Sequence, residues 1–155
     1  MKQQIKVLFD TNVLFGHDNR LFIDNIATKN LCECYWSPHI IGELYRTMTV
    51  KKLEKLGFRH AKQLSISSKK MMDIMEPYFY CVNSYSQIDM HLKYSIQDPD
   101  DFHLYQAATI AEVDYIVTIN GRDLKGIKDR LESRGTKVIN LKEFKHLMIT
   151  RIQAI

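Results

Sequence analysis

The stretch that most constrains the fold is the short, mostly apolar run at residues 5–9, which stops at a carboxylate, Asp10. β-Branched and aromatic residues dominate this run, so it predicts a buried strand. In an open parallel α/β sheet, ligands bind in the crevice beyond the carboxyl ends of the strands. Asp10 therefore has two interpretations: it caps the helix that follows, or it faces a ligand or cation at that edge.

The length of 155 residues predicts a single domain over residues 1–155 that buries roughly 70% of the surface of its unfolded chain. The apolar runs are too short to span a membrane, and the first strand begins too early for a signal peptide to precede it. Cys32, Cys34 and Cys81 are odd in number and lie in apolar stretches, which predicts buried, unreactive thiols in a reducing compartment. We therefore expect a cytoplasmic protein that does not bind membranes.

Strand and helix patterns alternate along the chain. The predicted strands are residues 5–9, 31–36, 78–82, 114–119 and 135–140, and the main predicted helices are residues 20–29, 38–56, 102–113 and 141–152. A further helix is expected between Gly57 and Pro77, a turn at 16–19 and a loop at 83–97. This alternation predicts an α/β domain with three layers, in which helices cover both faces of a parallel sheet.

Other acids stand near the starts of predicted helices. Glu43 falls in the second turn of the helix that follows Ser37-Pro38, where a solvated side chain is the simple interpretation. Asp98-Pro99-Asp100-Asp101 precedes the helix at 102–113, and Asp98 as N-cap with Asp101 at the third helical position would form a variant of the capping box. Each acid thus has a structural explanation when it is considered alone.

Basic residues gather in one segment, although the net charge of the whole chain is only +4. Between residues 46 and 70 a single acid, Glu54, opposes eight cations: Arg46, Lys51, Lys52, Lys55, Arg59, Lys62, Lys69 and Lys70. The segment forms either a solvated basic face or a groove for a nucleic-acid backbone, of which Arg46, Lys51, Lys52, Lys55 and Arg59 are the candidate contacts.

The predicted topology brings the separate acids together. Asp10, Asp101 and Asn120 follow strands or precede helices at one edge of the sheet, and Glu43 can lean toward the same place. Two carboxylates about 5 Å apart repel by roughly 3 kcal/mol at an effective dielectric constant near 20, so such a group needs a cation. Oxygen ligands select Mg²⁺ or Mn²⁺, and the chemistry this supports is phosphodiester hydrolysis.

Four segments in order resemble the successive motifs of PIN-domain proteins: residues 7–14, 37–44, 98–101 and 114–118. The resemblance covers nearly the whole chain. It implies a five-stranded parallel sheet between helical layers and an acidic metal site that is usually used to cleave single-stranded RNA. Many members of this family are toxins of toxin–antitoxin pairs, and many are dimers, so the resemblance implies an antitoxin partner and a homodimer.

By this resemblance, Asp10, Glu43 and Asp101 correspond to the acidic metal ligands, with Asp98 and Asp100 as alternatives to Asp101 because the register of this run is ambiguous. Thr118 and Asn120 correspond to positions where the family often has Thr-x-Asp. Asn120 supplies no charge at the position of that acid, although its carbonyl can hold a water or a metal. Asp123 compensates only if the turn folds back.

The leading hypothesis is a Mg²⁺- or Mn²⁺-dependent endoribonuclease in which Asp10, Glu43 and Asp101 hold the ion and Thr118 and Asn120 position water. The alternative, motivated by Asn120, is a non-catalytic RNA-binding module of the same fold with a degenerate metal site. A third hypothesis makes Asp10 the nucleophile of a dehalogenase-like phosphatase. Asn12 argues against it, since that mechanism needs a second acid at this position.

Overall fold

The computed structural model describes residues 3–82, 101–119 and 124–154 of the chain. Its strands are β1 (Lys6–Phe9), β2 (Glu33–Trp36), β3 (Phe79–Cys81), β4 (Tyr115–Thr118) and β5 (Lys137–Asn140). Its helices are α1 (Thr11–Phe15), α2 (His17–Thr28), α3 (Pro38–Leu56), α4 (Ala61–Met75), α6 (Phe102–Ala111), α7 (Lys125–Glu132) and α8 (Leu141–Gln153), with short 3₁₀ turns η1 (Phe58–His60) and η2 (Glu76–Tyr78).

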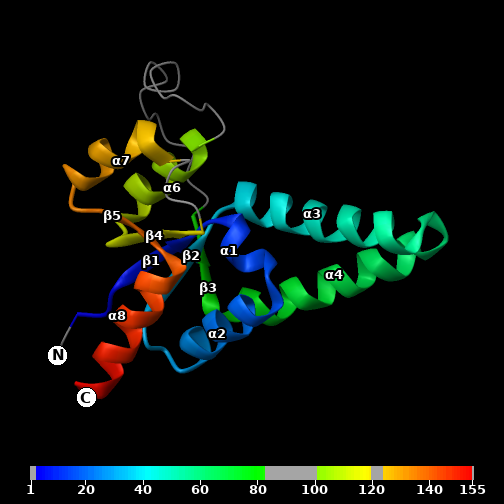
Figure 1. Ribbon diagram of the computed structural model, residues 1–155, viewed down its shortest axis with the longest axis horizontal. Coiled ribbons are helices and arrows are strands. Elements are labelled where there is room, and N and C mark those ends of the chain that lie inside the picture. Colours follow the sequence, from blue (N-terminus) through cyan, green and yellow to red (C-terminus); the bar gives the residue numbers. More distant parts are fainter. Residues whose placement is uncertain (1–2, 83–100, 120–123, 155) are drawn as a thin grey trace.

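The strands form one parallel sheet in the order β3-β2-β1-β4-β5. Helices α6 and α7 lie on one side of this sheet, and α2 and α8 lie on the other (Figure 1). The predicted three-layer α/β/α architecture with a five-stranded parallel sheet is therefore confirmed. None of the helices in the described ranges combines the length and the apolarity that a membrane span requires.

The centre of the core lies along β1. Val7, Leu8 and Phe9 are all fully buried, as expected for a strand that is covered by helices on both faces. The ring of Phe9 meets that of Phe144 from α8 edge-on, with centroids 5.3 Å apart, and the ring of Phe79 from β3 at 6.0 Å. The residue that follows this strand, Asp10, is thus attached to the most tightly packed part of the molecule.

Helices α3 and α4 pack along each other and project away from the sheet, to the right in Figure 1. We call α3, η1 and α4 together the arm. The start of α3 was predicted correctly because Ser37 caps it, accepting from the backbone N–H of Ile40 at 3.2 Å, and Pro38 occupies its first turn. Its end is equally well defined, since Gly57 adopts a φ of +84° that disfavours other residues.

Three local predictions were wrong. Residues 17–19 belong to α2 and not to a turn, because the extended backbone of Gly16 separates α2 from α1 within a single residue. Helix α6 begins at Phe102, so Asp101 is its N-cap residue and not its third residue, and its side chain makes no capping bond; Asp98, the predicted cap, lies outside the described residues. Cys81 is exposed on the edge strand β3, whereas Cys32 and Cys34 are buried with their sulfurs 3.6 Å apart.

Candidate active site

Asp10 lies at the switch point of the sheet, where the order of the strands reverses. It follows β1, whose neighbours β2 and β4 lead to opposite edges of the sheet, and its backbone N–H donates to the carbonyl of Val117 at 3.0 Å. Ligands bind at such switch points. Oδ1 of Asp10 accepts from the N–H of Thr11 at 2.7 Å, so the capping interpretation is confirmed. Capping does not exclude a second role, because the same side chain also lines a pocket.

Thr11 connects Asp10 to Glu43. While the backbone N–H of Thr11 donates to Asp10, its hydroxyl donates to Oε2 of Glu43 at 2.8 Å. Glu43 is partly buried on the inward side of α3, so the solvated interpretation of this side chain is wrong. One buried threonine therefore holds in place two carboxylates that are 33 residues apart in the sequence.

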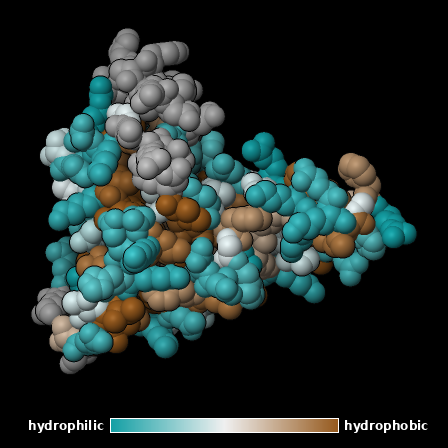
Figure 2. Space-filling model, viewed as in Figure 1, coloured by the Kyte–Doolittle hydropathy of each residue, from teal (hydrophilic) through white to brown (hydrophobic). Residues whose placement is uncertain are grey.

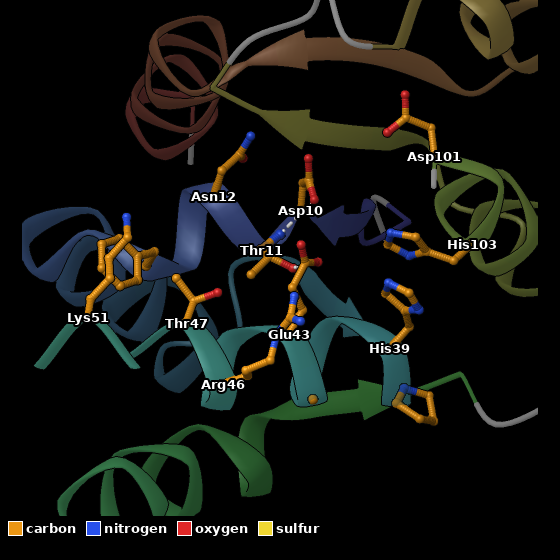
Figure 3. A pocket seen from close by; sticks show the side chains of 13 residues that line it. Asp10, Thr11, Asn12, His39, Glu43, Arg46, Thr47, Lys51, Asp101 and His103 are labelled. Carbon is orange, nitrogen blue, oxygen red and sulfur yellow. Dashed lines mark hydrogen bonds between the residues drawn. The ribbon is translucent and has the colours of Figure 1, made fainter. Parts of the chain in front are cut away.

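The carboxylates face a pocket of about 750 Å³. Asp10 follows β1, Glu43 comes from α3 and Asp101 precedes α6, so three separate elements bring acids to this one space (Figure 3). The pocket is lined by Asp10, Thr11, Asn12, Phe15, Pro38, His39, Gly42, Glu43, Arg46, Thr47, Lys51, Asp101 and His103. The topology alone had predicted that the three acids would share an edge of the sheet, and in the structure all three line this pocket.

Thr118 lies at the end of β4 and forms a hydrogen bond with the second oxygen of Asp10. Its hydroxyl donates to Oδ2 of Asp10 at 3.3 Å and accepts from Nδ2 of Asn12 at 3.4 Å. Both oxygens of Asp10 therefore have a donor, which fixes the plane of the carboxylate. The other sequence candidates, Asp98, Asp100, Asn120 and Asp123, lie outside the described residues.

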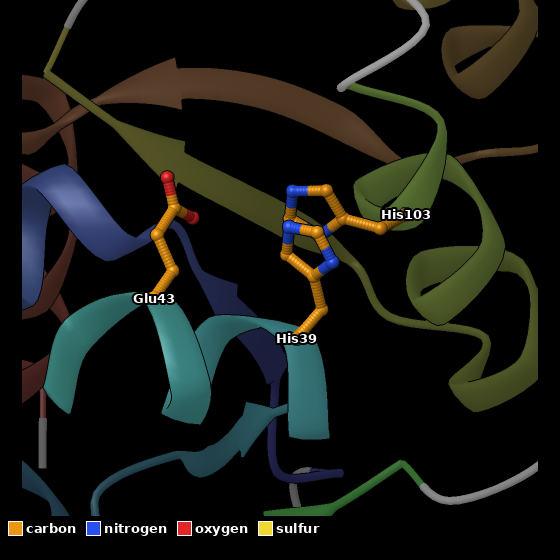
Figure 4. A group of neighbouring side chains, drawn as sticks. All are labelled: His39, Glu43 and His103. Carbon is orange, nitrogen blue, oxygen red and sulfur yellow. The ribbon is translucent and has the colours of Figure 1, made fainter. Parts of the chain in front are cut away.

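Two histidines that the sequence analysis did not single out stand beside the acids. His39 lies in the first turn of α3, and His103 lies in the first turn of α6; their rings stack with centroids 3.8 Å apart (Figure 4). Burial, and to a smaller extent the neighbouring His39, lower the pKa of His103 to about 4, so it is neutral at pH 7. The spacing of His39 and Glu43 was a usable signal, since residues four apart share a helix face.

The cations predicted to contact nucleic acid are spread along the arm. Arg46 and Lys51 line the pocket, and Nζ of Lys51 lies 4.3 Å from the centre of the Phe15 ring. Lys52 and Lys55 lie on α3 and Arg59 in η1, and these three are not among the described residues that line the pocket. The basic segment therefore begins at the acidic site and leads away from it.

The donors in the pocket form two overlapping sets. Asp10, Glu43 and Asp101 offer oxygen ligands, which fit a hard divalent ion such as Mg²⁺ or Mn²⁺. In the described part of the chain, one group of three donors has all its ligand atoms within 4.8 Å of one another, and this group is His39, Glu43 and His103. Glu43 belongs to both sets.

Comparison with known proteins identifies the family of the chain. A family model described as a PIN domain matches residues 6–122, which is more than half of the chain and includes β1 to β4. A search of curated proteins finds no match. The matched span, the five-stranded parallel sheet and the acids at its switch point lead to the same conclusion: the chain belongs to the PIN-domain family.

Proposed function

We propose that this protein is a divalent-metal-dependent endoribonuclease that hydrolyses phosphodiester bonds of single-stranded RNA. PIN domains are generally nucleases and typically use divalent metals. The observation that carries the proposal is the pair of carboxylates, Asp10 and Glu43, that Thr11 holds together in the pocket that Asp101 also lines. Such a concentration of negative charge is costly without a cation. Its place at the switch point of the sheet, where ligands bind, therefore favours a metal site.

Asp10, Glu43 and Asp101 are the residues that would hold the ion. The chemistry that Mg²⁺ or Mn²⁺ supplies in such a site is neutralisation of charge on the phosphate and activation of water. The chain's own contribution is orientation. Donors on both oxygens of Asp10 and on one oxygen of Glu43 keep their remaining lone pairs directed at fixed points, so little reorganisation is needed during the reaction.

Arg46, Lys51 and Phe15 are suited to hold the RNA. Arg46 and Lys51 are exposed cations at the pocket and attract the phosphate backbone. Phe15 also lines the pocket, and an unpaired base that displaces the Lys51 ammonium from its ring can stack there. Stacking needs a base that is free of a duplex, which is the reason for proposing a single-stranded substrate.

Replacing Asp10 tests the proposal most directly. Asn keeps an oxygen that accepts the N–H of Thr11, so the helix cap survives while the negative charge is lost. We expect Asp10→Asn to lower Mn²⁺-dependent cleavage of an end-labelled single-stranded RNA by at least ~100-fold, comparable to the loss of one strong electrostatic contact in other enzymes.

The matched control is Asp129→Asn, which removes an exposed carboxylate on α7. This variant should cleave at the parent rate. Circular dichroism and thermal unfolding establish that both variants are folded. Equal cleavage by Asp10→Asn and the parent protein would rule out the proposed site.

A second candidate function is a non-catalytic RNA-binding module. The observation that favours it is the amide at Asn120, where many family members carry an acid. Calorimetric titration with Mn²⁺ separates the two functions, because the nuclease must bind the ion and the module need not. A toxin role, an antitoxin partner and a homodimer rest on the family resemblance alone and stay proposals.

A further inference from the structure

Three side chains in the pocket form a compact group of mixed donors. His39 and Glu43 lie one helical turn apart on α3, and His103 reaches them from α6, so that the two rings and the carboxylate point into the same space (Figure 4). One atom from each lies within 4.8 Å of the other two. Ligand atoms of a tetrahedral zinc ion are about 3.3 Å apart, and the ion lies in the plane of each imidazole that binds it. Binding therefore requires movements of roughly 1 Å and a rotation of the exposed His39 ring out of its stack with His103.

The chemistry of this group differs from that of the acidic set. Two imidazoles and one carboxylate are a known combination of protein ligands for Zn²⁺, and they leave a fourth position open to water. Imidazole suits Zn²⁺ and other later transition metals, whereas Mg²⁺ prefers oxygen ligands and gives up its waters reluctantly. The histidine side of the pocket thus disfavours Mg²⁺, one of the two ions that the acidic side fits.

We propose that His39, Glu43 and His103 bind a Zn²⁺ ion and that this ion withdraws Glu43 from the acidic metal site. The first half stands on the geometry of the three side chains. The second half rests on the proposed function and assigns zinc the role of an inhibitor, because the hydroxyl of Thr11 occupies one oxygen of Glu43 and the two ions compete for the other.

Two further observations support a ligand at this place. The Nδ1 atom of His103 is buried and has no hydrogen-bond partner among the described residues, which is costly unless something else satisfies it. His39 is exposed, so an ion can reach the group from solvent. The hydroxyl of Thr11 occupies one oxygen of Glu43 and leaves the carboxylate a second oxygen for the ion.

Cobalt is a suitable probe, since Co²⁺ takes zinc sites and absorbs visible light. The protein should carry Cys81→Ser, which removes an exposed thiol that would compete for the ion. We expect one Co²⁺ to bind per chain with the spectrum of a four-coordinate site, and one equivalent of Zn²⁺ to displace it, while excess Mg²⁺ does not.

Variants locate the ion. His39→Asn and His103→Asn should each weaken Zn²⁺ binding by at least about tenfold, since even the loss of an outer-shell partner has an effect of that size. The matched control is His146→Asn, an exposed histidine on α8, which should bind as the parent does. Asp10→Asn should also keep the site. Unchanged binding in both ligand variants, or loss of binding in Asp10→Asn, would overturn the proposal.

The inhibitory half is tested by cleavage in Mn²⁺ with added Zn²⁺. Zn²⁺ should abolish cleavage by the parent protein. The concentration of Zn²⁺ that halves cleavage should be at least tenfold higher for His39→Asn. Equal inhibition of both proteins contradicts this half. A protein that binds zinc as described but cleaves no RNA in Mn²⁺ keeps the zinc site and disproves the proposed nuclease function, so the two failures are distinguishable.

Discussion

The sheet and the arm differ in how far their apolar side chains are buried. Along β1 and β4 the side chains of Leu8, Phe9 and Val117 are completely buried. At the tip of the arm the side chain of Phe58 is 87% exposed and that of Leu56 is 54% exposed, and apolar surface lies beside hydrophilic surface there (Figure 2). The sheet obtains its rigidity from burial, whereas the arm displays apolar and charged groups to solvent.

The pocket lies where these two regions join. Asp10 directly follows the buried strand β1, and Glu43 lies in the first turns of α3, at the start of the arm. Further out, α3 and α4 are linked by polar contacts, such as those between Tyr45 and Ser65 and between Thr49 and Ser68. If the proposed function is correct, we expect the sheet to orient the reacting groups and the arm to hold the nucleic acid.

Phe144→Ala tests the sheet side and should have the largest effect on stability. The ring of Phe144 is fully buried and meets the rings of Phe9 and Phe22 edge-on. Removing it leaves a cavity next to β1, for which we expect a loss of about 3–5 kcal/mol in the free energy of unfolding. Urea unfolding at neutral pH measures this loss.

The control on the same helix is Ile149→Ala. The side chain of Ile149 is 50% exposed, so its removal should change the free energy of unfolding by about 0.5 kcal/mol or less. If the two substitutions destabilised the protein equally, the sheet would not be the rigid region that the comparison requires.

The pH dependence of stability sharpens the comparison at the junction of the two regions. The pKa of His103 is about 4 in the folded protein, against 6.5 for an ordinary histidine. The unfolded chain therefore binds the proton more tightly, and the stability that neutral His103 contributes is present above about pH 6.5 and is lost as the pH falls toward 4. The difference between the two pKa values corresponds to about 3 kcal/mol.

The part of the pH dependence that is due to His103 is isolated by comparing the parent protein with His103→Asn in buffers that contain a metal chelator. The free energy of unfolding of the parent, relative to that of the variant, should fall by about 3 kcal/mol between pH 7 and pH 4. Carboxylates titrate in both proteins, so they cancel in the difference. A difference that does not change with pH would show that His103 is well solvated in the folded state.

The sequence predicted the fold well where local chemistry fixes a boundary. Ser37, Pro38 and Gly57 define both ends of α3, and the apolar run before Asp10 identifies the central strand. It failed at residues 17–19, because Gly16 and the polar residues after it are as compatible with a helix start as with a turn. The difference depends on how α1 and α2 pack, which no local pattern encodes.

The site was predictable in part for a related reason. Parallel strands bring their carboxyl ends to one edge, so the order of elements was enough to group Asp10 and Asp101. The pairing of His39 with His103 depends on the distance between α3 and α6, which spacing along the chain does not reveal. The role of Thr11 as the link between two acids was missed for the same reason.

Substitutions on the arm should hardly change the stability of the protein but should change its binding of RNA. Lys52→Gln, Lys55→Gln and Arg59→Gln together remove three cations that lie beyond the pocket. If each contacts one phosphate, the dependence of the logarithm of RNA affinity on the logarithm of salt concentration should become shallower by about 2. The free energy of unfolding should hardly change. Binding of a single-stranded RNA, followed by fluorescence anisotropy at several salt concentrations, measures the slope.

The matched control removes the same amount of charge elsewhere, through Lys29→Gln, Lys137→Gln and Lys142→Gln, three exposed lysines off the arm. Long-range attraction depends on net charge and would fall in both triple variants, whereas direct phosphate contacts are lost in only one. A slope that changes equally in the two proteins would mean that the arm attracts RNA without holding it. A change confined to the arm variant would place the RNA along α3, leading from the tip of the arm to the carboxylates of the pocket.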